Sequence, residues 1–174
     1  VTGSLPTGVT FDEATGTFTG PAGSEWNFTV NQISTGSGQH ICATTTTKEV
    51  RCWGANNYGQ LGDGTTTDRS TPVTVLAEGE SPGGAALTGV TEVSAGQGHA
   101  CALLTDSTVK CWGKDGFIDA GLGTTVDSTT PVTVLAEGES PGGAALTGVT
   151  QVSSGAWHTC ALLNDNTVQC WGFG

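Results

Sequence analysis

The feature that most constrains the fold is an internal repeat marked by cysteines. The chain has 174 residues, and its six cysteines form three pairs with nine residues between the partners. The pairs recur at equal intervals along the chain, as Cys42 and Cys52, Cys101 and Cys111, and Cys160 and Cys170. The run Thr71–Thr91 (TPVTVLAEGESPGGAALTGVT) returns unchanged as Thr130–Thr150. A fixed period of this kind is typical of arrays in which each repeat is one supersecondary unit.

Turn residues separate short Val- and Leu-containing runs along the chain, which predicts an all-β fold. No stretch keeps a helical period over a useful length, and the nearest candidate, Gly83–Leu87, is short and rich in Gly. The repeat divides the chain into a first unit at 31–91, a second at 92–150 and a third at 151–174. The third unit is expected to hold only its opening hairpin.

The central hairpin His99–Gly113 (HACALLTDSTVKCWG) shows what each unit builds. If Cys101 faces Cys111, then Leu103 faces Val109 and the turn lies at 105–107. Side chains alternate across a strand, so these four residues share one face, and both faces of the hairpin are largely apolar. Such a hairpin is expected to stack between two neighbouring sheets. The first unit has Thr44 and Thr45 in place of two leucines, which favours a capping or edge unit, with a unit that faces a wetter interface as the alternative.

Three equivalent cysteine pairs predict three local disulfides and an oxidising compartment, so we expect a secreted protein, extracellular or on a cell surface. Metal binding is the alternative, because His40, His99 and His158 each precede the first cysteine of a pair by two residues. Zinc sites usually use gaps of two to four residues between cysteines, and a gap of nine fits a hairpin better. We therefore expect no metal and no cofactor.

The repeat resembles that of the regulator-of-chromosome-condensation β-propeller family. The residues that carry the likeness are Val93–Gly96 (VSAG), His99–Leu103 (HACAL), Cys111–Gly113 (CWG) and Cys52–Gly64 (CWGANNYGQLGDG). The cysteine-bearing version is similar to secreted bacterial members. The resemblance implies a blade of about four antiparallel strands per repeat, arranged around a channel, with activity in surface loops.

The chain departs from that family pattern in three ways. Residues Lys114–Gly123 replace the Asn-Asn-Tyr-Gly-Gln-Leu-Gly-Asp-Gly stretch of the first unit. The family closes its ring with about seven blades, whereas this sequence holds at most three. Residues 1–30 instead resemble the closing half of a bacterial Ig-like module, which cannot close a sandwich alone.

The charge of the chain excludes some partners. Its net charge of −11, from 16 acidic and five basic residues, repels phosphate backbones and anionic lipids, so nucleic acid is not an expected partner. No apolar run reaches the roughly 18 residues needed to span a membrane.

The remaining motifs favour structural roles over catalysis. The three histidines have no nearby nucleophile elbow or paired carboxylates. Trp53, Trp112 and Trp171 recur beside a cysteine, as expected for packing between blades, with carbohydrate stacking as the alternative. Gly62–Asp68 offers oxygen ligands to calcium but lacks the full series of a known loop, so an ordinary turn is predicted. Asn27 begins a glycosylation motif within an expected strand.

These observations predict a non-catalytic extracellular structural or adhesive protein. The open-ended repeat, the incomplete N-terminal module and the disulfides favour assembly with other copies into an array or filament, in which strands of one copy complete the sheet of the next. The alternative is a propeller-type binding module that recognises a protein or glycan through its loops, including as an inhibitor. An enzyme is the class that the sequence supports least.

Overall fold

The structure is a computed structural model that describes residues 9–20, 26–114, 126–139 and 141–172. Within these ranges the chain forms thirteen β-strands and no helix, which confirms the all-β prediction. The strands are β1 (Thr10–Asp12), β2 (Thr17–Thr19), β3 (Phe28–Thr35), β4 (His40–Thr45), β5 (Val50–Gly54), β6 (Arg69–Thr74), β7 (Val90–Ala95), β8 (His99–Leu104), β9 (Val109–Gly113), β10 (Ser128–Thr133), β11 (Val149–Ser154), β12 (His158–Leu163) and β13 (Val168–Gly172).

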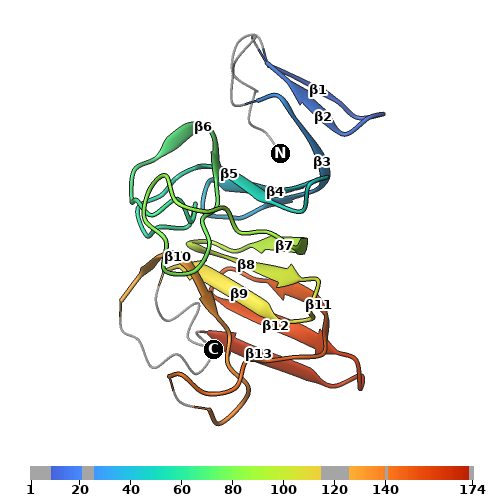
Figure 1. The fold of residues 1–174 in the computed structure, drawn as a ribbon, viewed down its shortest axis with the longest axis vertical. Helices are drawn as coiled ribbons and strands as arrows, with labels where there is room; N and C mark the ends of the chain where they lie inside the picture. The colour runs from blue at the N-terminus through green and yellow to red at the C-terminus, as the bar shows by residue number, and fades with distance from the viewer. Residues whose placement is uncertain (1–8, 21–25, 115–125, 140, 173–174) are drawn as a thin grey trace.

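Each unit is an antiparallel meander that forms one blade. Strands β3 to β6 form the first blade, β7 to β10 the second, and β11 to β13 the described part of the third. The blades stack in chain order along the long axis of the molecule (Figure 1). A strand, β11, precedes the hairpin of the third unit, so this unit holds more than the predicted hairpin. The predicted limits at 91/92 and 150/151 fall inside β7 and β11.

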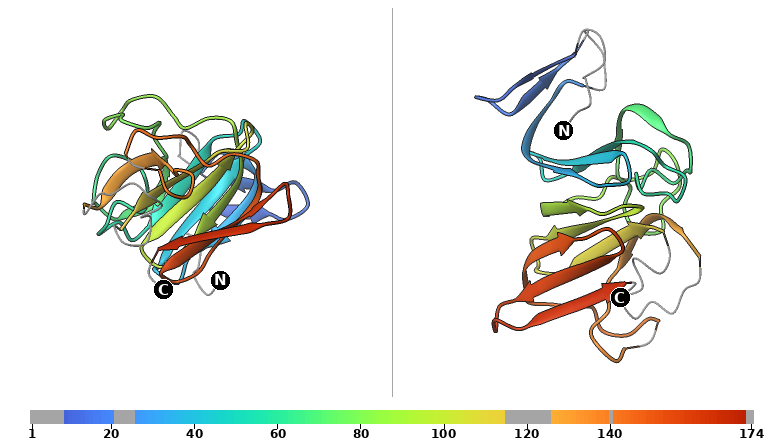
Figure 2. Two further views of the ribbon diagram at one scale, coloured as in Figure 1. Left: turned by 90° about the horizontal axis from the view of Figure 1, so that it is seen from below. Right: turned by 180° about the vertical axis from the view of Figure 1, so that it is seen from behind.

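The N-terminal strands are joined to the first blade rather than separate from it. Strand β3 pairs with β2 at its start and with β4 along its length, so the predicted limit at residue 30 lies within a strand. The hairpin β1–β2 stands at one end of the stack (Figure 2). Phe18 and Trp26 pack on Trp53 of β5, with ring centroids 5.7 and 5.2 Å away. The resemblance of this segment to an Ig-like module stays a prediction.

The hairpin register is the one that the sequence predicts. Cys101 pairs with Cys111 and Leu103 with Val109, and equivalent disulfides join Cys42 to Cys52 and Cys160 to Cys170. Asp106 fixes the turn by accepting hydrogen bonds from the amide and hydroxyl of Thr108 at 3.0 and 2.6 Å.

The two faces of the second blade enter two different cores. One face joins a core with Val149, Val152 and Trp171 of the third unit. The other joins a core with Val50 and Leu61 of the first unit. Apolar burial between blades therefore supplies the main stabilisation of the stack.

The polar residues that suggested an exposed edge in the first unit lie inside the structure. Thr44 is 1% exposed and Thr45 is 4% exposed. Thr45 finds partners within its own turn, through the hydroxyl of Thr47 at 2.8 Å and the amide of Glu49 at 3.1 Å. The cap on this unit is the aromatic N-terminal segment instead.

Candidate binding surface

Side chains on the first strand of each blade bond to the backbone of the next blade. The Ser34 hydroxyl accepts from the amide of Ala95 at 3.0 Å, and the Ser94 hydroxyl accepts from the amide of Ser154 at 2.8 Å. Gln32 accepts in the same way from Val93 at 2.9 Å. The carboxylate of Glu92, the counterpart of Gln32, accepts from Val152 at 3.3 Å. These bonds satisfy amides that strand pairing leaves free, so they fix how one blade sits on the next.

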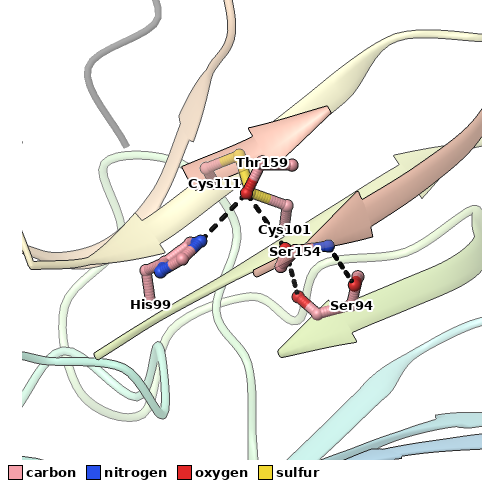
Figure 3. Close-up of a disulfide and its surroundings, with 6 residues drawn as sticks. All are labelled: Ser94, His99, Cys101, Cys111, Ser154 and Thr159. Atoms are coloured by element: carbon pink, nitrogen blue, oxygen red, sulfur yellow. Dashed lines mark hydrogen bonds between the residues drawn. A yellow bond between two sulfur atoms is a disulfide. The ribbon is translucent and has the colours of Figure 1, made fainter. Parts of the chain in front are cut away.

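The three predicted histidines occupy equivalent places beside these hydrogen bonds between blades. His40 and His99 are buried, with 1% and 0% of their surface exposed, whereas His158 is exposed. The Nε2 atom of His99 lies 2.9 Å from the Thr159 hydroxyl, which lies 3.5 Å from the Cys101 sulfur (Figure 3). His99 thus connects the second blade to the third.

The pKa values of the two buried histidines also indicate a packing role. Burial lowers the pKa of His40 to about 4. Burial, with the nearby rings of His40 and His158, lowers the pKa of His99 to about 4. Both rings are therefore neutral near pH 7 and poorly matched to acid–base catalysis there. Burial raises the pKa of Glu92 and outweighs the hydrogen bond from the Val152 amide.

A close backbone approach at the turn before each histidine explains a recurring glycine. A Cβ on Gly36 would lie 1.9 Å from the carbonyl oxygen of Gly96, and one on Gly96 would lie 2.7 Å from that of Gly155. Each of these positions also lies against the histidine ring of its own turn. A side chain has no room here, so the blades pack through glycine at this edge.

The three tryptophans are buried between layers. The Trp112 indole donates to the Gln60 carbonyl oxygen at 2.9 Å, so a residue of the second blade anchors a loop of the first. Trp53 lies under the N-terminal aromatic rings, and Trp171 packs in the core between the second and third units. The second-unit segment that corresponds to Gln60 lies in 115–125, outside the described residues, as does most of the divergent stretch 114–123.

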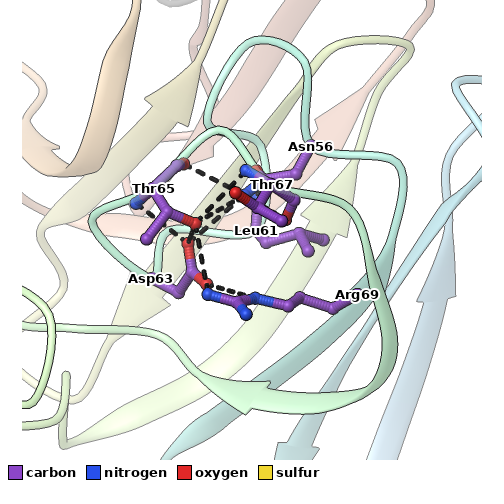
Figure 4. A network of polar contacts seen from close by, with 6 residues as sticks. All are labelled: Asn56, Leu61, Asp63, Thr65, Thr67 and Arg69. Carbon is purple, nitrogen blue, oxygen red and sulfur yellow. Dashed lines mark hydrogen bonds and ion pairs between the residues drawn. The ribbon is translucent and has the colours of Figure 1, made fainter.

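The segment weighed as a calcium loop is held by donors to its carboxylate. Asp63 accepts from the Thr65 amide and hydroxyl at 3.0 and 2.7 Å and from the Arg69 Nε at 2.9 Å (Figure 4). The Asn56 amide group reaches Asp63 at 3.2 Å and the Thr65 carbonyl at 3.0 Å. Although burial opposes it, these bonds and the Arg69 charge leave the pKa of Asp63 below its usual value. The Asp63 carboxylate therefore stabilises the turn through hydrogen bonds and an ion pair.

The described residues of the duplicated run make the same backbone contacts in both copies. The Val75 amide donates to Val50 and the Leu87 amide to Val75, and the second copy repeats both bonds at the equivalent positions. Leu76 pairs with Ala86 at the neck of the first loop, as their counterparts do in the second. The tips carry exposed acidic side chains, which are Glu78, Glu80, Glu137 and Glu139.

A mixed-charge groove of about 430 Å³ lies on the outer side of the first blade. Its lining includes Glu49, Arg51, Arg69 and Thr74, and residues 82–84 of the first duplicated loop close one side. A shallower hollow of about 420 Å³ at the other end of the stack is lined by His158, Trp171 and the third cystine. Across the described ranges, no three His, Cys, Asp or Glu side chains are grouped to hold a metal ion.

Comparison with known proteins gives the family. The description "Regulator of chromosome condensation (RCC1) repeat" matches residues 49–103, and a second form of the same repeat matches 30–60, 90–117 and 149–174. The chain belongs to the RCC1 repeat family. The antiparallel sheets of the three units are accordingly blades of an RCC1-like propeller.

Individual relatives of these RCC1 units are distant and much longer. The ultraviolet-B receptor UVR8 of Arabidopsis thaliana is 28% identical over 145 residues, which cover 82% of this chain and 29% of the receptor. Human WBSCR16 superposes with a TM-score of 0.67 at 22% identity, over 84% of this chain and 34% of that one. Prp20p of Saccharomyces cerevisiae gives 0.61 at 20% identity, over 83% and 33%. The chain therefore spans about a third of the length of these relatives.

The sequence analysis did not identify several residues that organise the RCC1 units. Ser94 and Gly96 were noted only as part of the family pattern, and the contacts that Ser34, Ser94 and the glycines before each histidine make with the next blade were not predicted. Their signal is positional, because a Gly stands three or four residues before each repeat histidine. Recurrence in the sequence indicates that such a residue is structural, but it does not identify the residue of the next unit that it contacts.

In the part of the chain that the structure describes, no helix is long and apolar enough to cross a membrane.

Proposed function

We propose that this chain is part of an RCC1-type propeller that binds a protein partner through its duplicated acidic loops. The observation that supports the proposal is that two groups of polar residues have different surroundings. Those that recur inside the units bond from blade to blade, whereas the loop tips present Glu80 and Glu139 to solvent. Exposed polar groups on loops held by a rigid scaffold are the usual place for recognition.

The loops are pre-organised for binding. In the first loop the Ala77 amide donates to Ala85 at 2.8 Å, and in the second the Ala136 amide donates to Ala144 at 2.9 Å. An ordered loop loses little conformational entropy on association, which favours affinity. Two identical acidic tips on consecutive blades, in a chain of net charge −11, select a partner with a basic surface.

The relatives support recognition more than self-assembly. UVR8 is described as a receptor, and the Prp20p structure is described with its binding properties to Gsp1p and histones. Assembly of copies into an array, which the sequence predicts first, has no comparable support. The binding-module alternative is therefore the function we propose, with the propeller as its scaffold and no catalytic role.

The test is a double variant that replaces one glutamate in each loop with uncharged glutamine. The double variant Glu80→Gln with Glu139→Gln is expected to weaken binding to a partner captured from the native source and then purified, because it removes two exposed negative charges. Glutamine keeps the shape of the side chain, so the loop backbone should not change. Glu13→Gln, at an exposed site outside the loops, is the control. Titration at two salt concentrations checks the electrostatic origin. Equal affinity of the double variant and the control variant would refute the proposal.

We also propose an oxidising, extracellular location. Three cystines pair all six cysteines, and such bonds persist mainly outside the reducing cytosol. The check is alkylation of protein taken from its native source without reductant. No thiol should react, and six reactive thiols would rule the location out.

A further inference from the structure

A glutamate fixes the first copy of the duplicated loop to the second blade. One oxygen of the Glu78 carboxylate accepts from the Lys110 ammonium at 2.5 Å and from the Thr133 hydroxyl at 2.8 Å, and the other accepts from the Thr133 amide at 3.2 Å. Burial alone would raise the pKa of Glu78, but these bonds and the Lys110 charge leave it below its usual value. The negative charge of Glu78 is therefore compensated by the next blade.

The second copy of the loop has the same sequence as the first. Glu137 is the counterpart of Glu78, and both side chains are exposed at the surface. In each copy, the amide two residues after this glutamate donates to the carbonyl of the alanine before it, at 3.2 Å in the first copy and 3.1 Å in the second. The two glutamates thus lie in equivalent turns, so a difference between them must come from the blade that follows.

The cation that holds Glu78 has no charged counterpart in the third blade. Lys110 is the second residue of β9, and the second residue of β13 is Gln169. A glutamine side chain carries no charge and cannot form an ion pair. Among the described residues, no hydrogen bond or ion pair holds the Glu137 carboxylate. Two loops of identical sequence therefore differ in the charge that they present to solvent.

We propose that Glu137 forms an ion pair with a lysine side chain of the basic partner, so that the second loop makes the stronger of the two loop contacts. This inference rests on the proposed function, and Gln169 is the residue that determines the difference. The ligand class follows from the first loop, where the same glutamate in the same sequence binds the ammonium of Lys110. The second blade supplies the ammonium to Glu78, whereas the partner supplies it to Glu137.

The second loop also attracts a basic segment more strongly as a whole. Glu137 and Glu139 lie two residues apart, and both are exposed. In the first loop only Glu80 of the corresponding pair is left without a cation, because Glu78 is paired with Lys110. Complementary charge sets which surface a partner meets and in which orientation, so a lysine-rich segment is directed to the second loop.

The probe is a blocked synthetic peptide, Gly-Lys-Gly-Lys-Gly, and its binding to the intact chain is followed by NMR titration. Glu137→Gln is expected to weaken binding about threefold, as for an exposed ion pair, whereas Glu78→Gln should leave the affinity unchanged. The two variants are matched, because they remove the same charge at equivalent positions of identical sequences. A difference between them therefore reports direct contact. A peptide with norleucine in place of lysine should not bind.

Exchanging the residues on β9 and β13 tests the cause of the difference. Gln169→Lys places a cation beside Glu137 and should weaken peptide binding as much as Glu137→Gln does. Lys110→Gln copies the third blade, releases Glu78 and should strengthen binding about twofold, because a second site becomes available. An unchanged affinity in Gln169→Lys, or equal effects of the Glu78 and Glu137 variants, would overturn the inference.

The loop-tip variant separates this inference from the proposed function. If Glu80→Gln with Glu139→Gln binds the peptide as tightly as the wild-type chain, the acidic loops are not the binding surface and both ideas fail. If that double variant binds weakly while the Glu78 and Glu137 variants behave alike, the loops bind the partner but are equivalent. In that case only the difference between the two loops is refuted.

Discussion

Mild acid should destabilise this fold through two buried histidines. The pKa of both His40 and His99 is about 4 in the folded chain, against 6.5 for an ordinary histidine. Because the folded-state value is depressed, the unfolded chain binds protons first as the pH falls. Stability is therefore complete above pH 6.5 and declines between pH 6.5 and pH 4.

The size of the effect follows from proton linkage. From pH 7.5 to pH 5 each ring should cost about 2 kcal/mol, or about 4 kcal/mol for the pair, with a slope of about 2 kcal/mol per pH unit near pH 5.5. Carboxylates with a lowered pKa, such as Asp63 and Glu78, lose their contribution only at lower pH. Glu92 acts in the opposite direction because its pKa is raised, so the measurement is best made in the Glu92→Gln background.

The assay is urea unfolding followed by tryptophan fluorescence at intervals between pH 7.5 and pH 5. Substituting Gln for His99 should lower the stability at pH 7.5 and remove about half of the slope, and adding the same change at His40 should remove the rest. Val109→Ala, in the same hairpin, lowers stability without changing a titrating group and serves as the control. A wild-type slope near zero, or a slope unchanged in the double variant, would refute the argument.

Three further results are expected. Replacing the Cys101–Cys111 pair by alanines should lower the free energy of unfolding by about 3 kcal/mol, because the short loop it closes regains its entropy in the unfolded chain; an unchanged urea midpoint would contradict this. Gly96→Ala should cost more than about 2 kcal/mol, because its Cβ would meet the His99 ring and the Gly155 carbonyl of the next blade, whereas Gly79→Ala, with open space but a φ of 77°, should cost about 1 kcal/mol. Similar costs for the two would exclude the close approach as the cause. Glu92→Gln should raise stability at pH 7.5 more than at pH 5, since an amide accepts from the next blade without a buried charge, as Gln32 does. Equal changes at both pH values would argue against a raised pKa at Glu92.

The local part of this fold was predictable from the sequence. Nine residues between cysteines, with Leu103 opposite Val109, define a hairpin register without knowledge of anything beyond the hairpin. Apolar residues on both faces then indicate a layer between two others, and both cores of the second blade are found. The periodicity of a strand and the geometry of a short turn are enough for these inferences.

The contacts between blades were not predictable in the same way. Ser94 is an ordinary strand serine in the sequence, and only the packed structure shows that it accepts a hydrogen bond from an amide of the third blade. Thr44 and Thr45 suggested an exposed edge because they are polar, yet both are buried, and Thr45 finds its partners within its own turn. Polarity alone is therefore a poor guide to exposure, since Thr45 finds partners within its turn whereas the Thr44 hydroxyl is buried without a partner among the described residues.

Position in the stack decides the environment of equivalent residues. Leu103 and Val109 are buried because the third blade covers them, whereas their counterparts Leu162 and Val168 are 37% and 62% exposed. At the opposite end, Trp53 is covered by N-terminal aromatic rings and Arg51 is left beside a carboxylate from its own hairpin. Each blade shares one core and several hydrogen bonds with the blade next to it. The burial of a repeat residue therefore depends on what packs against its blade as much as on the sequence of its own unit.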